Sequence, residues 1–525
     1  MVYPSSDSKK RVLVVAPPYR LNQTAYALGL MYIAAVLDRA GHHVEVIDMD
    51  ALNLPIEDYV HEIKERNYDY LCTGGMITAW NFLTFTAGLV KEVKPSAKVI
   101  VGGGIVSSTP QHFISASKAD VGVIGEGEDT VLDLIETFES GCSLSTVGGI
   151  VYKEDGQIVR TQERKNIGDL DKLPFPAWDL FNVGETYSRY PSHHSILHAR
   201  RFGSIYTTRG CPFRCTFCYT EKAVRQRSIP NVIEELKELR ARYGIRHIMI
   251  ADDLFVVRKK RTLEFCEAMI EHKMNMTWSC TGRCNIIDRE FLKLCKEAGC
   301  EFMGLGLESG SDMVLKAIKK SQTPEQIVDA VRMVKEAGIT PGGTFILGLP
   351  PETKETMRET AEIYKKINQY RGHVNKFFFA TPYPGTELYD QMLAENKIGD
   401  EIKYFEKISE YGDAVDFVIN CTSSITDEDL IKLKRELEQE VLDDFIKKHP
   451  FLSMGHAILQ KTPLGKIRTL LIMLKIKGFH EGAVFLWKKI LAKLKLIPDP
   501  YERRWSKKKS YAYAQTLIEG RMVAF

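Results

Sequence analysis

Short apolar runs alternate with helical patterns along the first 150 residues. Residues 11–16 form a β-branched apolar run that ends at a pair of prolines, 28–40 follows a helical period, and 43–48 reads as a second strand. The same alternation continues, with strands predicted at 70–74, 98–102 and 121–125 and helices near 81–93 and 129–140. This alternation predicts a parallel sheet with helices on both faces and ligands at the carboxyl ends of the strands.

A second series of strand and helix patterns begins near residue 202. Six apolar runs recur, and polar or glycine residues gather where each run ends. The predicted strands are 204–208, 247–251, 277–281, 302–307, 343–347 and 376–380. Six such repeats predict a partial barrel of the TIM type, which builds its active site at the carboxyl ends of the strands.

The segments around these two patterns are shorter and less regular. A hairpin pattern covers 151–160, a proline-rich stretch covers 173–179, and 426–449 reads as a charged helix with Thr426 as its N-cap. We therefore expect an α/β protein with a Rossmann-like unit at 1–148, a connector at 149–200, a barrel at 201–390 and a helical C-terminal region at 391–525.

Composition is ordinary for a globular protein, and it adds only a prediction of the cellular compartment. Of the 525 residues, 44% are apolar and 26% are charged, and the formal net charge is only +3. Eleven cysteines, an odd number, and a polar N-terminus without an apolar core predict a reducing cytoplasm. No apolar run reaches the roughly 18 residues that indicate a spanning helix.

Three cysteines at a C-x3-C-x2-C spacing are the strongest chemical signal in the chain. Cys211, Cys215 and Cys218 lie just after the first predicted barrel strand. Thiolates are the usual ligands of iron–sulfur clusters, and three of them leave one iron of a four-iron cluster open to a substrate. A closed zinc site would need a fourth ligand, which no neighbouring C-x2-C pair or histidine supplies. Three structural thiols in a turn are the alternative.

This stretch, including Phe217 before the last cysteine, resembles the cluster motif of the radical S-adenosylmethionine enzymes. In that family the open iron binds the methionine part of S-adenosylmethionine, and reductive cleavage yields a 5'-deoxyadenosyl radical. The resemblance implies that Asp252 binds the methionine amino group and that Glu308 lies near the ribose. It also implies that Arg283 pairs with the methionine carboxylate and that Tyr219 lies along the adenine. Surface charge or ordinary packing is the alternative at each position.

Glycine-rich strand ends in the first pattern are similar to the cobalamin-binding domain found ahead of the cluster domain in one class of this family. By this resemblance Gly74, Gly103, Gly125 and Glu126 are cofactor-binding residues. Glycine lets the backbone approach a bulky ligand closely, although structural turns explain the same residues. Dinucleotide binding is disfavoured because no G-x-G-x-x-G follows the first strand. Residues 16–30 contain no histidine that could be a lower ligand of cobalt.

The resemblance covers about residues 10–390 and implies a cobalamin-dependent radical enzyme with a 4Fe-4S cluster. The reaction expected first is methylation of an unactivated carbon in a small-molecule or lipid substrate. One S-adenosylmethionine methylates cobalamin, a second gives the adenosyl radical, and the substrate radical takes the cobalt-bound methyl. Radical cyclisation and rearrangement stay open as alternatives, because relatives carry them out without methyl transfer.

Two further functions fit less well. A methylthiotransferase acting on transfer RNA would need a second cluster, for which Cys72 and Cys142 provide too few thiolates. A non-enzymatic cobalamin or redox carrier would not require the whole barrel pattern. We expect no nucleic-acid partner and a reducing partner such as flavodoxin or ferredoxin, and the sequence does not indicate an oligomeric state.

Residues 461–495 form a basic amphipathic pattern in which Glu481 is the only acid. A helix of this kind can lie on an anionic membrane surface, where each basic residue adds about 1 kcal/mol. A lid helix packed on the barrel is the alternative. The pattern predicts peripheral contact of a cytoplasmic protein with the inner membrane surface, and it makes a lipid substrate attractive.

Overall fold

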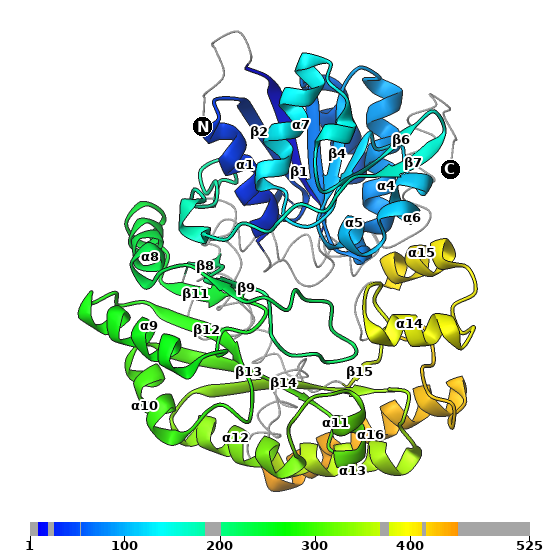
Figure 1. The fold of residues 1–525 in the computed structure, drawn as a ribbon. Helices are drawn as coiled ribbons and strands as arrows, with labels where there is room; N and C mark the ends of the chain where they lie inside the picture. The colour runs from blue at the N-terminus through cyan, green and yellow to red at the C-terminus, as the bar shows by residue number, and fades with distance from the viewer. Residues whose placement is uncertain are drawn as a thin grey trace, which may run out of the picture.

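Two β-sheets lie one above the other in the computed structural model of the chain (Figure 1). The structure describes residues 9–18, 26–52, 54–183, 201–367, 377–411 and 416–449. The first sheet has the order β2-β1-β3-β4-β5-β6-β7. Its strands are β1 (Arg11–Ala16), β2 (His43–Asp48), β3 (Tyr70–Gly74), β4 (Lys98–Gly102), β5 (Val121–Val123), β6 (Ile150–Glu154) and β7 (Gln157–Arg160).

Helices cover both faces of this sheet. The chain moves from β1 to β2 at one edge and then returns to β3, so right-handed crossovers place α1 on one face and α3 and α4 on the other, while α7 packs beside α1. The helices are α1 (Leu28–Arg39), α2 (Met49–Leu52), α3 (Ile56–Glu65), α4 (Trp80–Val93), α5 (Gly104–Ser108), α6 (Pro110–Ala116) and α7 (Glu128–Ser140). The predicted parallel α/β layer is confirmed, and we call residues 9–160 the N-terminal unit.

The hairpin predicted over 151–160 is confirmed, with Asp155 and Gly156 in its turn, and it belongs to the first sheet. β6 runs antiparallel to β5, and β7 runs antiparallel to β6. Both turn residues have positive φ, which Asp and Gly tolerate better than most residues. The sheet therefore extends past residue 148, because the hairpin covers the edge that β5 would otherwise expose.

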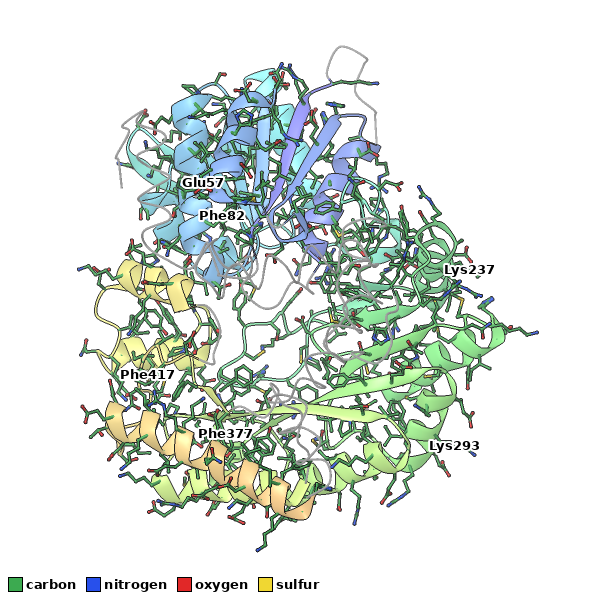
Figure 2. All side chains as sticks on the ribbon, turned by 180° about the vertical axis from the view of Figure 1, so that it is seen from behind. Glu57, Phe82, Lys237, Lys293, Phe377 and Phe417 are labelled. Atoms are coloured by element: carbon green, nitrogen blue, oxygen red, sulfur yellow. The ribbon has the colours of Figure 1, made fainter. Side chains whose placement is uncertain are left out.

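The second sheet is the predicted series of six parallel strands, in the order β15-β14-β13-β12-β11-β8. Helices on its outer side carry Lys237 and Lys293 outward (Figure 2). The strands are β8 (Phe202–Ile205), β11 (His247–Ile250), β12 (Thr277–Gly282), β13 (Cys300–Glu308), β14 (Thr340–Leu347) and β15 (Phe377–Phe379). The helices are α8 (Ile229–Tyr243), α9 (Lys259–Glu271), α10 (Arg289–Glu297), α11 (Asp312–Ala317), α12 (Pro324–Glu336) and α13 (Lys354–Ile367). β8 and β15 stand at the two ends, so the barrel is partial.

The C-terminal region that the structure describes is helical, with α14 (Glu387–Ala394), α15 (Glu401–Tyr411) and α16 (Asp427–Lys448). The predicted N-cap of α16 is confirmed, because Thr426 Oγ1 accepts a hydrogen bond from Asp429 N at 3.2 Å. The basic pattern at 461–495 lies outside the described residues. In the described parts of the chain, no helix has both the length and the apolar character needed to cross a membrane.

A continuous set of buried apolar side chains joins the two sheets through the connector. Tyr26 lies edge-on to Trp178 and Phe202, with ring centroids 5.8 and 5.4 Å apart. The Tyr26 hydroxyl also donates to Phe202 O at 2.5 Å, so the start of β8 is tied to the N-terminal unit. These contacts fix β8, the edge strand of the second sheet, against the N-terminal unit, which lies above it in Figure 1.

Candidate active site

The three-cysteine motif lies in the loop of a small hairpin. Its strands, β9 (Thr208–Arg209) and β10 (Arg225–Gln226), pair antiparallel, and residues 210–224 form the loop between them. Gly210 has φ +91°, and a Cβ there would lie 2.5 Å from Ala223 O. Only glycine fits this close approach, which lets Cys211 N donate to Glu221 O at 2.7 Å. We call this element the cluster hairpin (208–226).

The cluster hairpin brings the three predicted thiols within interaction range of one another. Shielding from water, together with the nearby Cys215 and Cys211 thiols, raises the pKa of Cys218 to about 11. Within the described residues no three His, Cys, Asp or Glu side chains are gathered to hold a single metal ion. A four-iron cluster makes a different demand, because each thiolate binds its own iron. A loop with three neighbouring thiols fits that donor set.

Asp252 and Asp253 follow β11 and hold the base of the cluster hairpin. Asp252 Oδ1 accepts hydrogen bonds from the backbone N of Thr207 at 2.6 Å and of Thr208 at 3.0 Å. Its Oδ2 accepts from the Thr207 hydroxyl at 2.6 Å, and Asp253 Oδ2 accepts from Gly210 N at 3.2 Å. Burial raises the pKa of Asp252, although these hydrogen bonds lower it. The first barrel strand therefore ends earlier than predicted, since Thr207 and Thr208 bond to Asp252.

Arg283 lies between the cluster hairpin and the segment after β13, and it contacts both. Its guanidinium stacks 3.7 Å from the Phe213 ring centroid and lies 4.0 Å from Cys215 Sγ. Its Nη2 donates to Lys320 O, while its buried Nε has no partner among the described residues. A buried guanidinium with an unused donor could bind a carboxylate.

Glu308 is the last residue of β13. It has a positive φ and forms a buried ion pair. Its φ is +62°, and its Oε1 accepts from Lys320 Nζ at 2.7 Å. Burial lowers the pKa of Lys320, but the charges of Glu308 and Cys215 outweigh burial and raise it overall. Sequence reasoning missed Lys320, which is twelve positions from Glu308 and carries no motif of its own. Its only sequence signal is its place after a polar strand end.

Tyr219 points from the cluster hairpin toward the N-terminal unit. Its ring covers Gly385, where a Cβ would lie 2.7 Å from the ring edge. Burial raises the pKa of Tyr219, and a hydrogen bond with Ser107 on α5 opposes that rise. Tyr219 is 41% exposed, so part of its ring is open to solvent.

The glycine-rich ends of the first sheet pack closely against one another. A Cβ on Gly74 would lie 2.6 Å from Gly102 O, and one on Gly103, which has φ +83°, would lie 2.9 Å from Gly75 N. Gly125 N donates to Ser107 Oγ at 2.9 Å. Close backbone packing therefore explains why glycine stands at these positions. The glycines also keep bulky side chains away from this edge of the sheet.

The carboxylate of Glu126 is bound by protein groups. It accepts hydrogen bonds from Arg209 at 2.5 Å, from Arg225 at 2.7 Å and from Ile167 N at 2.6 Å. Burial raises the pKa of Glu126, but hydrogen bonds and charges from Arg225 and Arg209 outweigh it and lower the pKa overall. The structure therefore turns this side chain toward the cluster hairpin and the connector.

Comparisons with known proteins agree with this arrangement. Residues 205–364 match the radical SAM superfamily, and residues 20–135 match the B12 binding domain. An uncharacterized methyltransferase of Pyrococcus horikoshii is 32% identical over 74% of this chain and 84% of its own. An anaerobic magnesium-protoporphyrin IX monomethyl ester cyclase of Rubrivivax gelatinosus is 29% identical over 75% of this chain and 71% of its own.

A solved structure shares the fold of nearly the whole chain. The cobalamin-dependent S-adenosylmethionine radical enzyme OxsB, with aqua-cobalamin and S-adenosylmethionine bound, matches with a TM-score of 0.60 and 19% identity. The match covers 98% of this chain and 75% of the OxsB chain. At this identity the similarity concerns the fold alone.

Proposed function

Because this chain belongs to the cobalamin-binding radical S-adenosylmethionine enzymes, we propose that it methylates an unactivated carbon of a small-molecule or lipid substrate. The observation that supports this most directly is the meeting of two strand edges. The glycine-lined edge of the N-terminal unit faces the carboxyl edge of the barrel, and the cluster hairpin lies between them (Figure 1). A substrate held there would be within reach of both edges.

The family uses a four-iron cluster, S-adenosylmethionine and cobalamin, and we assign the cluster to Cys211, Cys215 and Cys218. When bound, the cluster supplies the electron that cleaves S-adenosylmethionine, and cobalamin supplies the methyl group. The protein must deliver the thiols as thiolates, so loading should release protons. Asp252 and Asp253 hold the base of this loop through Thr207, Thr208 and Gly210, and they act here as positioning residues.

Binding of S-adenosylmethionine is proposed for the groups around Arg283. Its unused Nε and its place beside Cys215 suit the methionine carboxylate. Glu308 and Lys320 balance each other in charge close by, so neither is left as a free charge beside Arg283. The partly exposed ring of Tyr219 offers an apolar surface for the adenine.

A radical cyclase or rearrangement enzyme is the second candidate. The similarity to the protoporphyrin ester cyclase over 75% of this chain favours it, because that relative is named for ring closure. We further propose a small electron carrier such as flavodoxin or ferredoxin as the reducing partner. Membrane contact through 461–495 remains a prediction of the sequence pattern.

An anaerobic assay separates the candidates. The reconstituted enzyme, with reductant, S-adenosylmethionine and cobalamin, is analysed for 5'-deoxyadenosine and S-adenosylhomocysteine as separate products. We expect both, dependent on cobalamin and lost in Cys215→Ala. The exposed thiol of Cys142 provides the matched control, so Cys142→Ala should retain both products.

The other outcomes are equally informative. Deoxyadenosine alone, formed in proportion to consumed substrate, would contradict methyl transfer and favour the cyclase or rearrangement. Neither product from protein with a full cluster and bound cobalamin would contradict the enzymatic assignment itself. The search for substrate begins with lipid extracts and then small metabolites.

A further inference from the structure

Four charged side chains join the turn after β5 and the first residue of α7 to both strands of the cluster hairpin. Arg209 on β9 reaches two carboxylates, with Nη1 at 2.5 Å from Glu126 Oε1 and Nη2 at 2.5 Å from Glu128 Oε1. Arg225 on β10 reaches Glu126 Oε2 with Nη1 at 2.7 Å. Two carboxylates and two guanidiniums therefore form one connected group, which we call the clamp.

Because its side chains are largely buried, breaking the clamp should have a larger energetic effect than breaking a surface ion pair. Its side chains are only 18% (Arg209), 14% (Glu126), 5% (Glu128) and 13% (Arg225) exposed. Exposed pairs contribute little, whereas removing one partner of a buried pair leaves a charge without compensation. The Arg209 guanidinium also lies 5.3 Å from the centroid of the Tyr32 ring on α1, so it is enclosed by the N-terminal unit.

The connector takes part in the same group of contacts. Ile167 N donates to Glu126 at 2.6 Å, and Ile167 O accepts from Arg225 at 2.7 Å. Arg225 Nη2 then donates to Glu221 at 2.6 Å, and the backbone O of Glu221 accepts from Cys211 N at 2.7 Å. A short series of polar contacts thus leads from the turn after β5 to the first cysteine.

The cluster hairpin is held from two sides. Barrel contacts reach its base through Asp252, and they reach its loop through Thr216, whose N donates to Ile318 O at 3.2 Å and whose O accepts from Leu388 N at 2.9 Å. The clamp holds the same hairpin from the N-terminal unit. The position of the cysteines relative to that unit therefore depends on the clamp.

We propose that Glu126, Glu128, Arg209 and Arg225 are positioning residues that fix the three-cysteine loop against the glycine-lined edge of the N-terminal unit. The carboxylates of the turn are occupied by arginines, so any contact of this turn with a cofactor is made through its backbone. This inference goes beyond the proposed methyl transfer, because it holds equally for a cyclase with the same two units.

Hydrogen exchange on the full chain without cofactors tests the clamp independently of any activity. We expect Glu126→Gln and Arg225→Gln to speed amide exchange roughly tenfold in peptides covering 208–226, because a partly buried charge loses one of its partners. Glu128→Gln removes one contact only and should act in the same direction with a smaller effect. It also serves as the second variant if Glu126→Gln does not fold.

Asp133→Asn is the matched control. Asp133 lies on α7, the helix that follows the turn. It pairs with Arg164 of the connector and not with a residue of the cluster hairpin. We expect this variant to leave exchange in 208–226 unchanged. Unchanged exchange in both Glu126→Gln and Arg225→Gln, or an equal increase in Asp133→Asn, would overturn the proposal.

A second measurement, on the enzyme loaded with both cofactors, tests whether the clamp sets the distance between the cluster and cobalamin. The reduced cluster and cobalamin in its Co(II) form are both paramagnetic, and the splitting of their electron paramagnetic resonance signals depends on their separation. We expect Glu126→Gln to broaden or reduce this splitting at full iron and cobalt content, with Asp133→Asn unaffected. A spectrum identical to the wild type in folded, loaded Glu126→Gln would overturn the positioning role.

Discussion

Glu308 and Lys320 form an ion pair that is nearly closed to water, with side chains 10% and 7% exposed. The neighbouring Lys319 pairs with Glu387 at 2.6 Å, but those side chains are 51% and 56% exposed. We expect Glu308→Gln to lower the free energy of unfolding by about 3 kcal/mol, because it leaves Lys320 charged and buried. Glu387→Gln should cost less than about 1 kcal/mol. Urea unfolding measures both, and equal losses would contradict the argument.

Glu352 predicts a pH dependence of stability. Its Oε2 accepts from Gly348 N at 2.6 Å and Leu349 N at 2.9 Å, while its buried Oε1 has no partner among the described residues. Burial raises the pKa of Glu352 to about 8, although the two N–H groups lower it. The folded state thus favours the protonated acid. Its stabilising effect is fully present below the unfolded pKa and is lost as pH rises toward about 8.

We expect Glu352→Gln to reduce the dependence of the free energy of unfolding on pH, because the amide keeps the acceptor oxygen and cannot ionise. Urea unfolding at about pH 5, 6.5 and 8 measures it, and the wild type should lose on the order of a few kcal/mol across that range. Glu355→Gln is the control, since the pKa of Glu355 is lowered by a hydrogen bond with Thr353 and by its own backbone N–H, so it stays ionised throughout. An unchanged slope in Glu352→Gln would show that another group titrates.

At the scale of elements, α15 joins the C-terminal region to the N-terminal unit. Phe405 is fully buried, with ring centroids 5.0 Å from Trp80 and 5.7 Å from His112. Ser409 Oγ accepts from Asn81 N and donates to Thr78 O, both at 3.0 Å. The start of α4 is therefore covered by a helix more than 300 positions later in the chain.

We expect Phe405→Ala to lower the free energy of unfolding by about 3–5 kcal/mol and to release α15 from this contact. Limited proteolysis should then cut near α15 while the barrel stays intact. Phe417→Ala is the matched control, because Phe417 packs 5.4 Å from Phe379 near the end of β15 (Figure 2). Protection of α15 equal to wild type in Phe405→Ala would contradict this docking role.

At the scale of the whole molecule, three separate contacts set how the two units face each other (Figure 1). The connector packs Trp178 against Tyr26, α15 docks on α4, and the clamp joins the N-terminal unit to the cluster hairpin. Contacts on both sides of the hairpin limit rotation of one unit against the other. A reaction that needs two cofactors at a fixed separation requires that restraint.

The sequence alone predicted the elements and the chemistry that are local in the chain. Alternating apolar runs predicted both sheets, because each strand and helix is decided by neighbouring residues. Thr426 predicted the start of α16, and the spacing of the cysteines predicted the donor set of the cluster hairpin. Even there the first barrel strand was placed late, since its end depends on Asp252.

Only the tertiary structure decided which distant side chains meet. Glu126 pairs with Arg209, 83 positions away, although its motif had suggested a cofactor contact. Lys320 became part of the site because the segment after β13 folds back over Glu308. No periodicity encodes such pairs, because their free energy depends on burial and geometry that exist only once the two sheets have packed.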